Sequence, residues 1–139
     1  MKIPQKILII GGGGYIGSML IPELVKNEYY VRCFDRFTSS DTFSKLKSNK
    51  NTEVVIGDVR DIALENFFGV DIVIDLVSLT KNLDKEEVIQ INKNSRQKII
   101  EISKQNGISQ YIRISSSNVY AGNLRSEERR VGKECRSRW

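Results

Sequence analysis

An apolar segment that runs directly into four consecutive glycines restricts the fold of this chain more than any other feature. Residues 7–17 read I-L-I-I-G-G-G-G-Y-I-G, and the residues after them have helical periodicity. A strand, a glycine turn and a helix in this order form a cradle for a phosphate group. The glycines let the backbone approach the anion, and the first amides of the helix point at it. We therefore expect an anion-binding turn at residues 11–17.

The rest of the chain alternates strand-like and helix-like segments. In such alternation each pair of parallel strands is joined by a right-handed helical crossover, so the sequence predicts an α/β fold with a doubly wound parallel sheet. The expected strand order is 3-2-1-4-5, with the ligand site outside the carboxyl ends of strands 1 and 4. Apolar runs predict strands at residues 6–10, 29–34, 52–56, 71–77 and 111–114. Helices are expected at residues 15–27, within 38–51, at 61–68 and at 84–106.

The glycines satisfy two dinucleotide-binding spacings, which share Gly14 and Gly17. The pattern G-x-G-x-x-G begins at Gly12, and the pattern G-x-x-G-x-x-G begins at Gly11. In either register the first amides of the following helix would face a pyrophosphate, whereas the alternative interpretation is a flexible turn. The residues expected to hold the pyrophosphate are Gly11, Gly14, Tyr15, Ile16 and Gly17.

Asp35 follows the second strand and lies 18 residues after Gly17. A carboxylate at this place can accept both hydroxyls of the adenosine ribose and would repel a 2′-phosphate, which favours NAD over NADP. Arg36 is the counter-argument, because an arginine can pair with a 2′-phosphate. A solvated strand end is the alternative for both residues.

Two further strand ends contribute candidate residues. Asp58 follows the third strand and could take the adenine amino group, with Val59 covering the ring; a turn-forming Gly-Asp pair is the alternative. The end of the fourth strand is expected to flank the nicotinamide ribose through its backbone. The residues there are Leu76, Val77 and Ser78.

Charge gives no reason to expect a nucleic-acid partner. The net charge is +5, of which residues 1–124 carry +2 and residues 125–139 carry +3, so the body is close to neutral. The arginine-rich end, R-S-E-E-R-R-V-G-K-E-C-R-S-R-W, resembles a translated sequencing adapter. We therefore expect one domain at residues 1–124 and a non-native tail at 125–139. A basic arm for nucleic acid or a membrane surface is the alternative.

Cysteine usage favours a reducing compartment. Cys33 and Cys135 lie far apart and predict no disulfide framework, which indicates the cytoplasm. No apolar run approaches the roughly 20 residues of a membrane span. We expect neither a membrane partner nor a metal site.

The whole pattern of residues 5–122 resembles the extended short-chain dehydrogenases, the NAD-dependent epimerase/dehydratase family. The resemblance rests on G-G-G-G-Y-I-G, Asp35, G-D-V-R-D, Asn92 and S-S-S-N-V-Y-A-G at residues 115–122. It implies a Rossmann fold, bound NAD, a nucleotide-sugar substrate and a complete protein that forms a homodimer. It also implies that Ser116, four residues before Tyr120, hydrogen-bonds the reacting sugar hydroxyl.

The resemblance also implies a catalytic base that these residues do not supply. In the family the base is a Tyr in Y-x-x-x-K, but Tyr120 is followed four residues later by Leu124, and the chain has no His. Ser117 and Asn118 stand where dehydratases place an acid pair, which favours an epimerase or a plain dehydrogenase. We expect the NAD-binding part of an epimerase/dehydratase-type oxidoreductase, without turnover by the 139-residue chain.

Two alternatives stay open at this stage. A non-enzymatic NAD(P)-sensing module would also lack Y-x-x-x-K, and a methyltransferase could use a glycine-rich loop but would not predict the serines near Ser116. The absence of G-K-[ST] excludes a kinase-type phosphate loop. Ile10, Asp75 and the pair Val77-Ser78 depart from the residues usual in the epimerase/dehydratase family.

Overall fold

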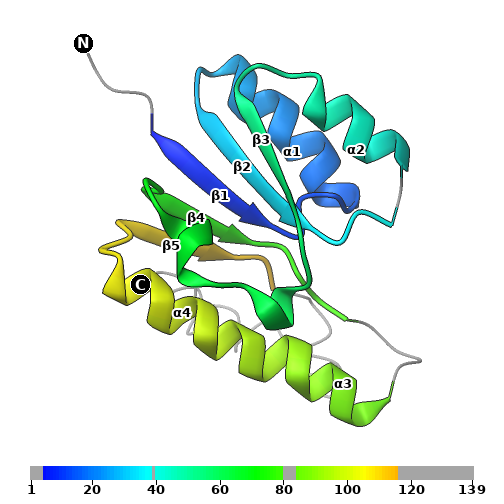
Figure 1. Ribbon diagram of the computed structural model, residues 1–139, viewed down its shortest axis with the longest axis vertical. Helices are drawn as coiled ribbons and strands as arrows, with labels where there is room; N and C mark the ends of the chain where they lie inside the picture. Colours follow the sequence, from blue (N-terminus) through cyan, green and yellow to red (C-terminus); the bar gives the residue numbers. More distant parts are fainter. Residues whose placement is uncertain (1–4, 39, 80–83, 116–139) are drawn as a thin grey trace, which may run out of the picture.

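The computed structural model describes residues 5–38, 40–79 and 84–115, which form a five-stranded parallel sheet with helices on both faces (Figure 1). The strand order is β3-β2-β1-β4-β5, and all four pairings are parallel. The predicted fold class and strand order are confirmed. The strands are β1 Lys6–Ile10, β2 Tyr30–Asp35, β3 Thr52–Ile56, β4 Ile72–Asp75 and β5 Gln110–Arg113.

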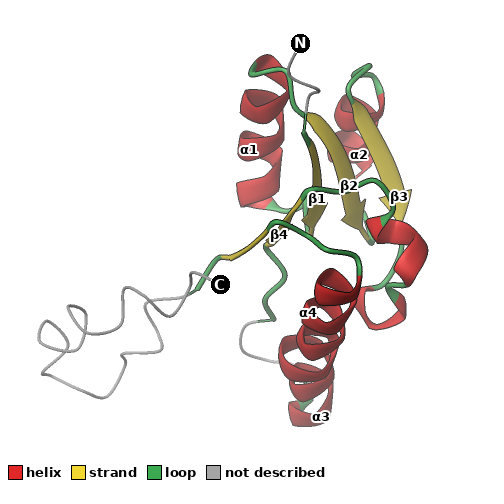
Figure 2. Cartoon of the chain, turned by 90° about the vertical axis from the view of Figure 1, so that its left-hand side faces the viewer, coloured by secondary structure: helices red, strands yellow, loops and turns green. Residues whose placement is uncertain are grey.

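Two layers of helix cover the sheet (Figure 2). One face carries α1 Tyr15–Lys26 and α2 Ser40–Lys47. The other face carries a continuous helical rod, which contains α3, the π turn η3 and α4. None of the described helices is long and apolar enough to cross a membrane. The rod consists of α3 Lys85–Ile89, η3 Gln90–Ser95 and α4 Arg96–Gln105.

Strand β1 lies at the centre of the sheet and separates two hydrophobic cores. Its side chains alternate between the faces, so Leu8 and Ile10 pack in the core under α4, and Ile7 and Ile9 pack in the core under α1. All four are buried. A parallel sheet covered on both faces requires such uninterrupted apolar strands, which explains why the segment reads as a continuous apolar run.

The segment between β3 and β4 differs from the expectation. The helix predicted at residues 61–68 is wrong, because two short 3-10 helices occupy this region, η1 Val59–Asp61 and η2 Leu64–Phe67. The side chain of Asp58 caps η1 by accepting the Arg60 amide, and Asn66 accepts the Ala63 amide. These local side-chain bonds replace the hydrogen bonds that an α-helix would need. The fourth strand is also shorter than the predicted 71–77, since it ends at Asp75.

The long helix predicted at residues 84–106 is present but not regular. It changes from α to π geometry at Gln90–Ser95 and returns to α geometry at Arg96. The chain leaves the helix at Gly107, whose φ of +64° is in the left-handed region that favours glycine. The predicted end of this helix is confirmed.

Arg32 is a buried cation on β2, on the side of the sheet that faces η2. Its Nε donates to Glu53 at 2.9 Å, and its Nη1 donates to the carbonyls of Asn66 at 2.8 Å and Phe68 at 3.1 Å. The guanidinium thereby satisfies the carbonyls that end a short 3-10 helix. Arg32 contacts no part of the cavity described below.

Candidate functional site

A cavity of about 210 Å³ lies at the carboxyl ends of β1, β2, β3 and β4. Its volume is below the roughly 300–1,000 Å³ of a pocket that encloses a drug-sized ligand, so it can enclose part of a dinucleotide. Phe34, Gly57, Leu79 and Ile91 line it without having been predicted. Nine predicted residues also line it: Gly11, Gly14, Asp35, Arg36, Asp58, Val59, Leu76, Val77 and Ser78.

The glycine turn connects the end of β1 to the start of α1. It begins at Gly11, whose φ of +82° lies in the left-handed region that favours glycine. A Cβ on Gly12 would lie 2.4 Å from the Cys33 Sγ, and a Cβ on Gly17 would lie 2.2 Å from the Gly12 carbonyl oxygen. Gly12 and Gly17 are therefore required by the packing of the turn against β2 and α1. Gly17 is buried and is not part of the cavity wall.

Gly14 differs from these packing glycines. It caps α1 with an extended backbone, φ −80° and ψ −177°, and a Cβ there would meet only the Gly11 carbonyl oxygen, at 3.5 Å. An ordinary side chain therefore fits the fold at this position. Yet Gly14 lines the cavity, where a Cβ would occupy space beside the start of a helix. Its lack of a side chain leaves room for a group outside the chain.

The amino end of α1 offers donors with no partner inside the helix. The first amides of any α-helix lack intrahelical acceptors, and Gly14 provides no side chain to cap them. Neither Tyr15 nor Ile16 lines the cavity, and both side chains are exposed, Tyr15 to 81%. The predicted role therefore rests on their amides, which follow Gly14 at the start of α1. Helix amides and the positive end of the helix dipole favour an anion.

Asp35 ends β2, and its carboxylate accepts two backbone amides. The Gly13 amide donates to Oδ2 at 3.0 Å, and the Phe37 amide donates to Oδ1 at 2.9 Å. An ionised carboxylate has about four acceptor sites, so two remain for other donors. Phe37 is held in turn by Phe43, whose ring packs edge to face at 5.3 Å between centroids. The carboxylate is fixed in place with acceptor capacity to spare.

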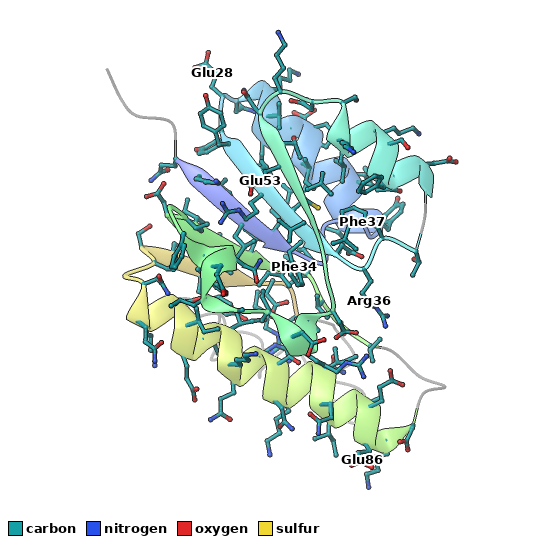
Figure 3. All side chains as sticks on the ribbon, in the orientation of Figure 1. Glu28, Phe34, Arg36, Phe37, Glu53 and Glu86 are labelled. Carbon is teal, nitrogen blue, oxygen red and sulfur yellow. The ribbon has the colours of Figure 1, made fainter. Side chains whose placement is uncertain are left out.

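Arg36 and Arg60 both pair with Asp58. Arg60 donates to its carboxylate at 2.8 and 2.7 Å, and Arg36 lies 3.8 Å from it while its own side chain projects outward (Figure 3). The hydrogen bonds from Arg60 lower the pKa of Asp58 to about 2, against the opposing effect of partial burial. Asp58 is thus ionised at neutral pH, and Arg36 is directed to it rather than to Asp35.

The end of β4 carries a buried carboxylate that the sequence did not identify as functional. Asp75 is 2% exposed, and its carboxylate accepts from Arg96 at 3.3 Å and from the Tyr111 hydroxyl at 2.8 Å. Burial and the neighbouring Asp75 charge raise the pKa of Tyr111, which keeps this hydroxyl a donor. A carboxylate at the end of an otherwise apolar strand was the available signal, but the sequence does not show its partners.

Ser116, the predicted catalytic residue, lies outside the described residues, as do Tyr120 and the predicted tail at 125–139. Their roles stay predictions. Within residues 5–38, 40–79 and 84–115, no three His, Cys, Asp or Glu side chains are grouped to hold a metal ion.

The sequence matches one family and several curated proteins. Residues 8–138 match the 3-beta hydroxysteroid dehydrogenase/isomerase family, a range that reaches into the predicted tail. A putative UDP-glucose 4-epimerase from Methanocaldococcus jannaschii is 39% identical over 71 residues, covering 49% of this chain and 22% of that protein. A 3 beta-hydroxysteroid dehydrogenase/Delta 5→4-isomerase from Mycobacterium tuberculosis is 23% identical over 127 residues, covering 84% and 33%. The chain spans only 22% and 33% of the length of these two relatives.

Solved structures share the fold. The Bordetella bronchiseptica enzyme WbmG in complex with NAD and UDP has a TM-score of 0.79 at 20% identity, over 88% of this chain and 41% of that chain. A putative NAD-dependent epimerase/dehydratase from Bacillus halodurans has a TM-score of 0.70 at 18% identity, over 84% of this chain and 54% of that chain. At such identities the likeness concerns the fold alone.

Proposed function

The chain belongs to the 3-beta hydroxysteroid dehydrogenase/isomerase family, and from that premise we propose that its cavity binds NAD as the cofactor site of an epimerase- or dehydrogenase-type oxidoreductase. The family match agrees with the resemblance that the sequence motifs indicate. Bound NAD would supply the hydride acceptor; the chain supplies binding and orientation.

Gly14 is the observation that carries this proposal. The fold has room for a side chain there, but the site has a glycine beside unpaired helix amides, as a bound phosphate requires. Neighbouring glycines are explained by packing within the chain, and Gly14 is not. A pyrophosphate over Gly14 would receive the amides of Tyr15 and Ile16.

The order of the strands supports an assignment of the remaining parts of the dinucleotide. From β3 to β4 the sheet edge presents Asp58, then Asp35, then the glycine turn, then Val77. Adenine, ribose, pyrophosphate and nicotinamide ribose follow one another in the same order along NAD. We assign the two spare acceptor sites of Asp35 to the adenosine ribose hydroxyls, which also disfavours a 2′-phosphate. Leu76, Val77 and Ser78 would flank the nicotinamide ribose.

For the complete protein we propose a nucleotide-sugar substrate, with Ser116 orienting the reacting hydroxyl. The support is the 39% identity over 71 residues to a putative UDP-glucose 4-epimerase, against 23% over 127 residues to a 3 beta-hydroxysteroid dehydrogenase/Delta 5→4-isomerase. The 139 residues include neither Y-x-x-x-K nor a histidine. We therefore propose that this chain binds NAD without turning over a substrate. Binding without turnover would equally serve an NAD(P)-sensing module.

Calorimetric titration of the folded 139-residue chain tests the cofactor proposal. We expect NAD to bind, NADP to bind at least about tenfold more weakly, equivalent to about 1.4 kcal/mol, and S-adenosylmethionine not to bind. If the folded chain does not bind NAD at concentrations up to about 1 mM, which corresponds to a binding free energy near −4.1 kcal/mol, the cofactor assignment is wrong. Preferential binding of S-adenosylmethionine would indicate a methyltransferase instead.

A further inference from the structure

Residues 76–79 line the cavity after β4 ends. The Leu76 amide still donates to the Ile10 carbonyl of β1, whereas the residues after it are held by side chains of β4 and of the helical rod. The first held residue is Val77. Its amide donates to the Asp75 Oδ1 at 3.0 Å, and its carbonyl accepts from the Arg96 Nη2 at 3.2 Å. Both polar groups of the Val77 backbone are therefore satisfied by two side chains that also pair with each other.

The second held residue is Leu79. Its amide donates to the Asn92 Oδ1 at 3.0 Å, and its carbonyl accepts from the Asn92 Nδ2 at 3.0 Å. The two held residues are two apart, about 6.6 Å in extended chain. Asn92 lies in the π turn and Arg96 directly follows it, and the Arg96 guanidinium also donates to the Asn92 carbonyl. These two residues of the rod hold alternate residues of the segment.

Ser78 lies between the two held residues. Because Val77 and Leu79 turn their backbone groups toward the rod, those of Ser78 are directed to the opposite side in extended chain. Ser78 is exposed and lines the cavity, as Val77 and Leu79 do. No described residue hydrogen-bonds the Ser78 backbone. Its amide and carbonyl are available to a ligand.

Arg96 links the rod, the strand and the segment. Its guanidinium binds Asp75, the Val77 carbonyl and the Asn92 carbonyl, and its side chain is 12% exposed. A buried ion pair adds little to stability because desolvation offsets the attraction, so its benefit is geometric. Three directed bonds from a planar guanidinium fix the segment relative to the rod in a way that a single ammonium cannot.

We propose that Arg96, oriented by Asp75, is a positioning residue that holds residues 76–79 so that the Ser78 backbone meets the nicotinamide-ribose half of the bound dinucleotide. This inference rests on the proposed NAD site. Arg96 itself does not line the cavity and acts through Val77.

ADP separates this role from a general structural one, because it shares the adenosine and pyrophosphate groups of NAD but lacks the nicotinamide ribose. In the full chain, Arg96→Met should weaken NAD about tenfold and leave ADP within about twofold, as expected when a preorganised contact is lost. Arg96→Lys keeps the charge beside Asp75 but not the three directed bonds, so its NAD affinity should be intermediate. If Arg96→Met does not fold, the pair Asp75→Asn with Arg96→Gln removes both charges and should give the same selective loss.

Arg32→Met is the matched control. It removes an equally buried arginine that also binds one carboxylate and several backbone carbonyls, but is not part of the cavity wall. It should lower the melting temperature while leaving the NAD-to-ADP affinity ratio unchanged. Equal weakening of NAD and ADP by the Arg96 variants, or no weakening of either, overturns the positioning role alone. Failure of the unsubstituted chain to bind NAD and ADP overturns the proposed function, and this inference with it.

Discussion

The Gly13 amide donates a hydrogen bond to the Asp35 carboxylate at 3.0 Å and thereby joins the glycine turn to the end of β2. The contact is close, since a Cβ on Gly13 would lie 2.9 Å from the Asp35 Cγ. Asp35 thus fixes the glycine turn. In the proposed site it would also offer its remaining acceptor sites to the ribose. A change at Asp35 should affect both halves of the adenosine diphosphate site.

Asp35→Asn should weaken NAD binding and reduce the preference for NAD over NADP. The amide retains one acceptor oxygen, but it loses the charge that strengthens bonds to backbone amides and that repels a phosphate. We expect about tenfold weaker NAD binding and a loss of about 1 kcal/mol in the free energy of unfolding. Titration with both cofactors and urea unfolding measure the two effects. Asp41→Asn, at the first turn of α2, should change neither.

Gly14 and Gly17 should respond differently to alanine. Gly17→Ala places a Cβ 2.2 Å from the Gly12 carbonyl oxygen and should cost about 3 kcal/mol of stability. Gly14→Ala has room and a permitted backbone, so it should cost no more than about 1 kcal/mol. It should nevertheless abolish NAD binding. Thermal unfolding measures the loss of stability in each variant, and titration with NAD measures the loss of binding. An unchanged NAD affinity in Gly14→Ala would contradict the placement of the phosphate beside Gly14.

The sequence was sufficient to predict the strands and their order, because buried strands and helices repeat apolar residues at regular intervals. The bounds of β1 and β3 agree with the predicted runs, and the strand order follows from the βαβ crossovers. The glycine turn and the strand ends at Asp35 and Asp58 fall around one cavity, as their positions after strands predict.

Contacts between distant side chains were not predictable in this way. The π turn depends on local bonding around Gln90, where the Ser95 hydroxyl donates to a carbonyl five residues earlier, and hydrophobic periodicity does not record it. Asp75 meets Arg96 and Tyr111 only after β4, β5 and the rod have packed. Single-sequence patterns carry no signal for pairings across 21 and 36 residues.

Asp58 should stabilise the fold in a pH-dependent manner. Its pKa is about 2 in the folded chain against an ordinary 3.8, so its stabilisation is present above about pH 4 and disappears as the pH falls through 2. Solvent screening limits the effect to about 1 kcal/mol or less. In urea unfolding, Asp58→Asn should therefore have a lower free energy of unfolding than the unsubstituted chain at pH 7, and the difference should be smaller at pH 3. Asp61→Asn serves as the control, since Asp61 makes no ion pair within the described residues. A deficit that grows on acidification would contradict the assignment.

Cys33 should be unreactive in the folded chain. It is fully buried under Gly12, and burial, with a smaller effect of the Asp35 charge, raises its pKa to about 12. Because only the thiolate reacts, alkylation at pH 8 should be at least about 100-fold slower than in guanidinium chloride. Cys135→Ser leaves Cys33 as the single thiol to be followed by mass spectrometry. Labelling of the folded chain at the unfolded rate would show that the turn opens freely.

The π turn at Gln90–Ser95 sets how many residues of the helical rod separate Asn92 from Arg96 in space, and both residues hold the segment beside the cavity. A π turn is equivalent to one residue inserted into an α-helix. Removing one residue inside this turn would restore a regular α-helix without turning α4, but Arg96 would then follow Asn92 by three residues instead of four. The contact between the Arg96 guanidinium and the Asn92 carbonyl would change although both residues were still present. In this part of the chain, the spacing between residues carries information that their identities do not.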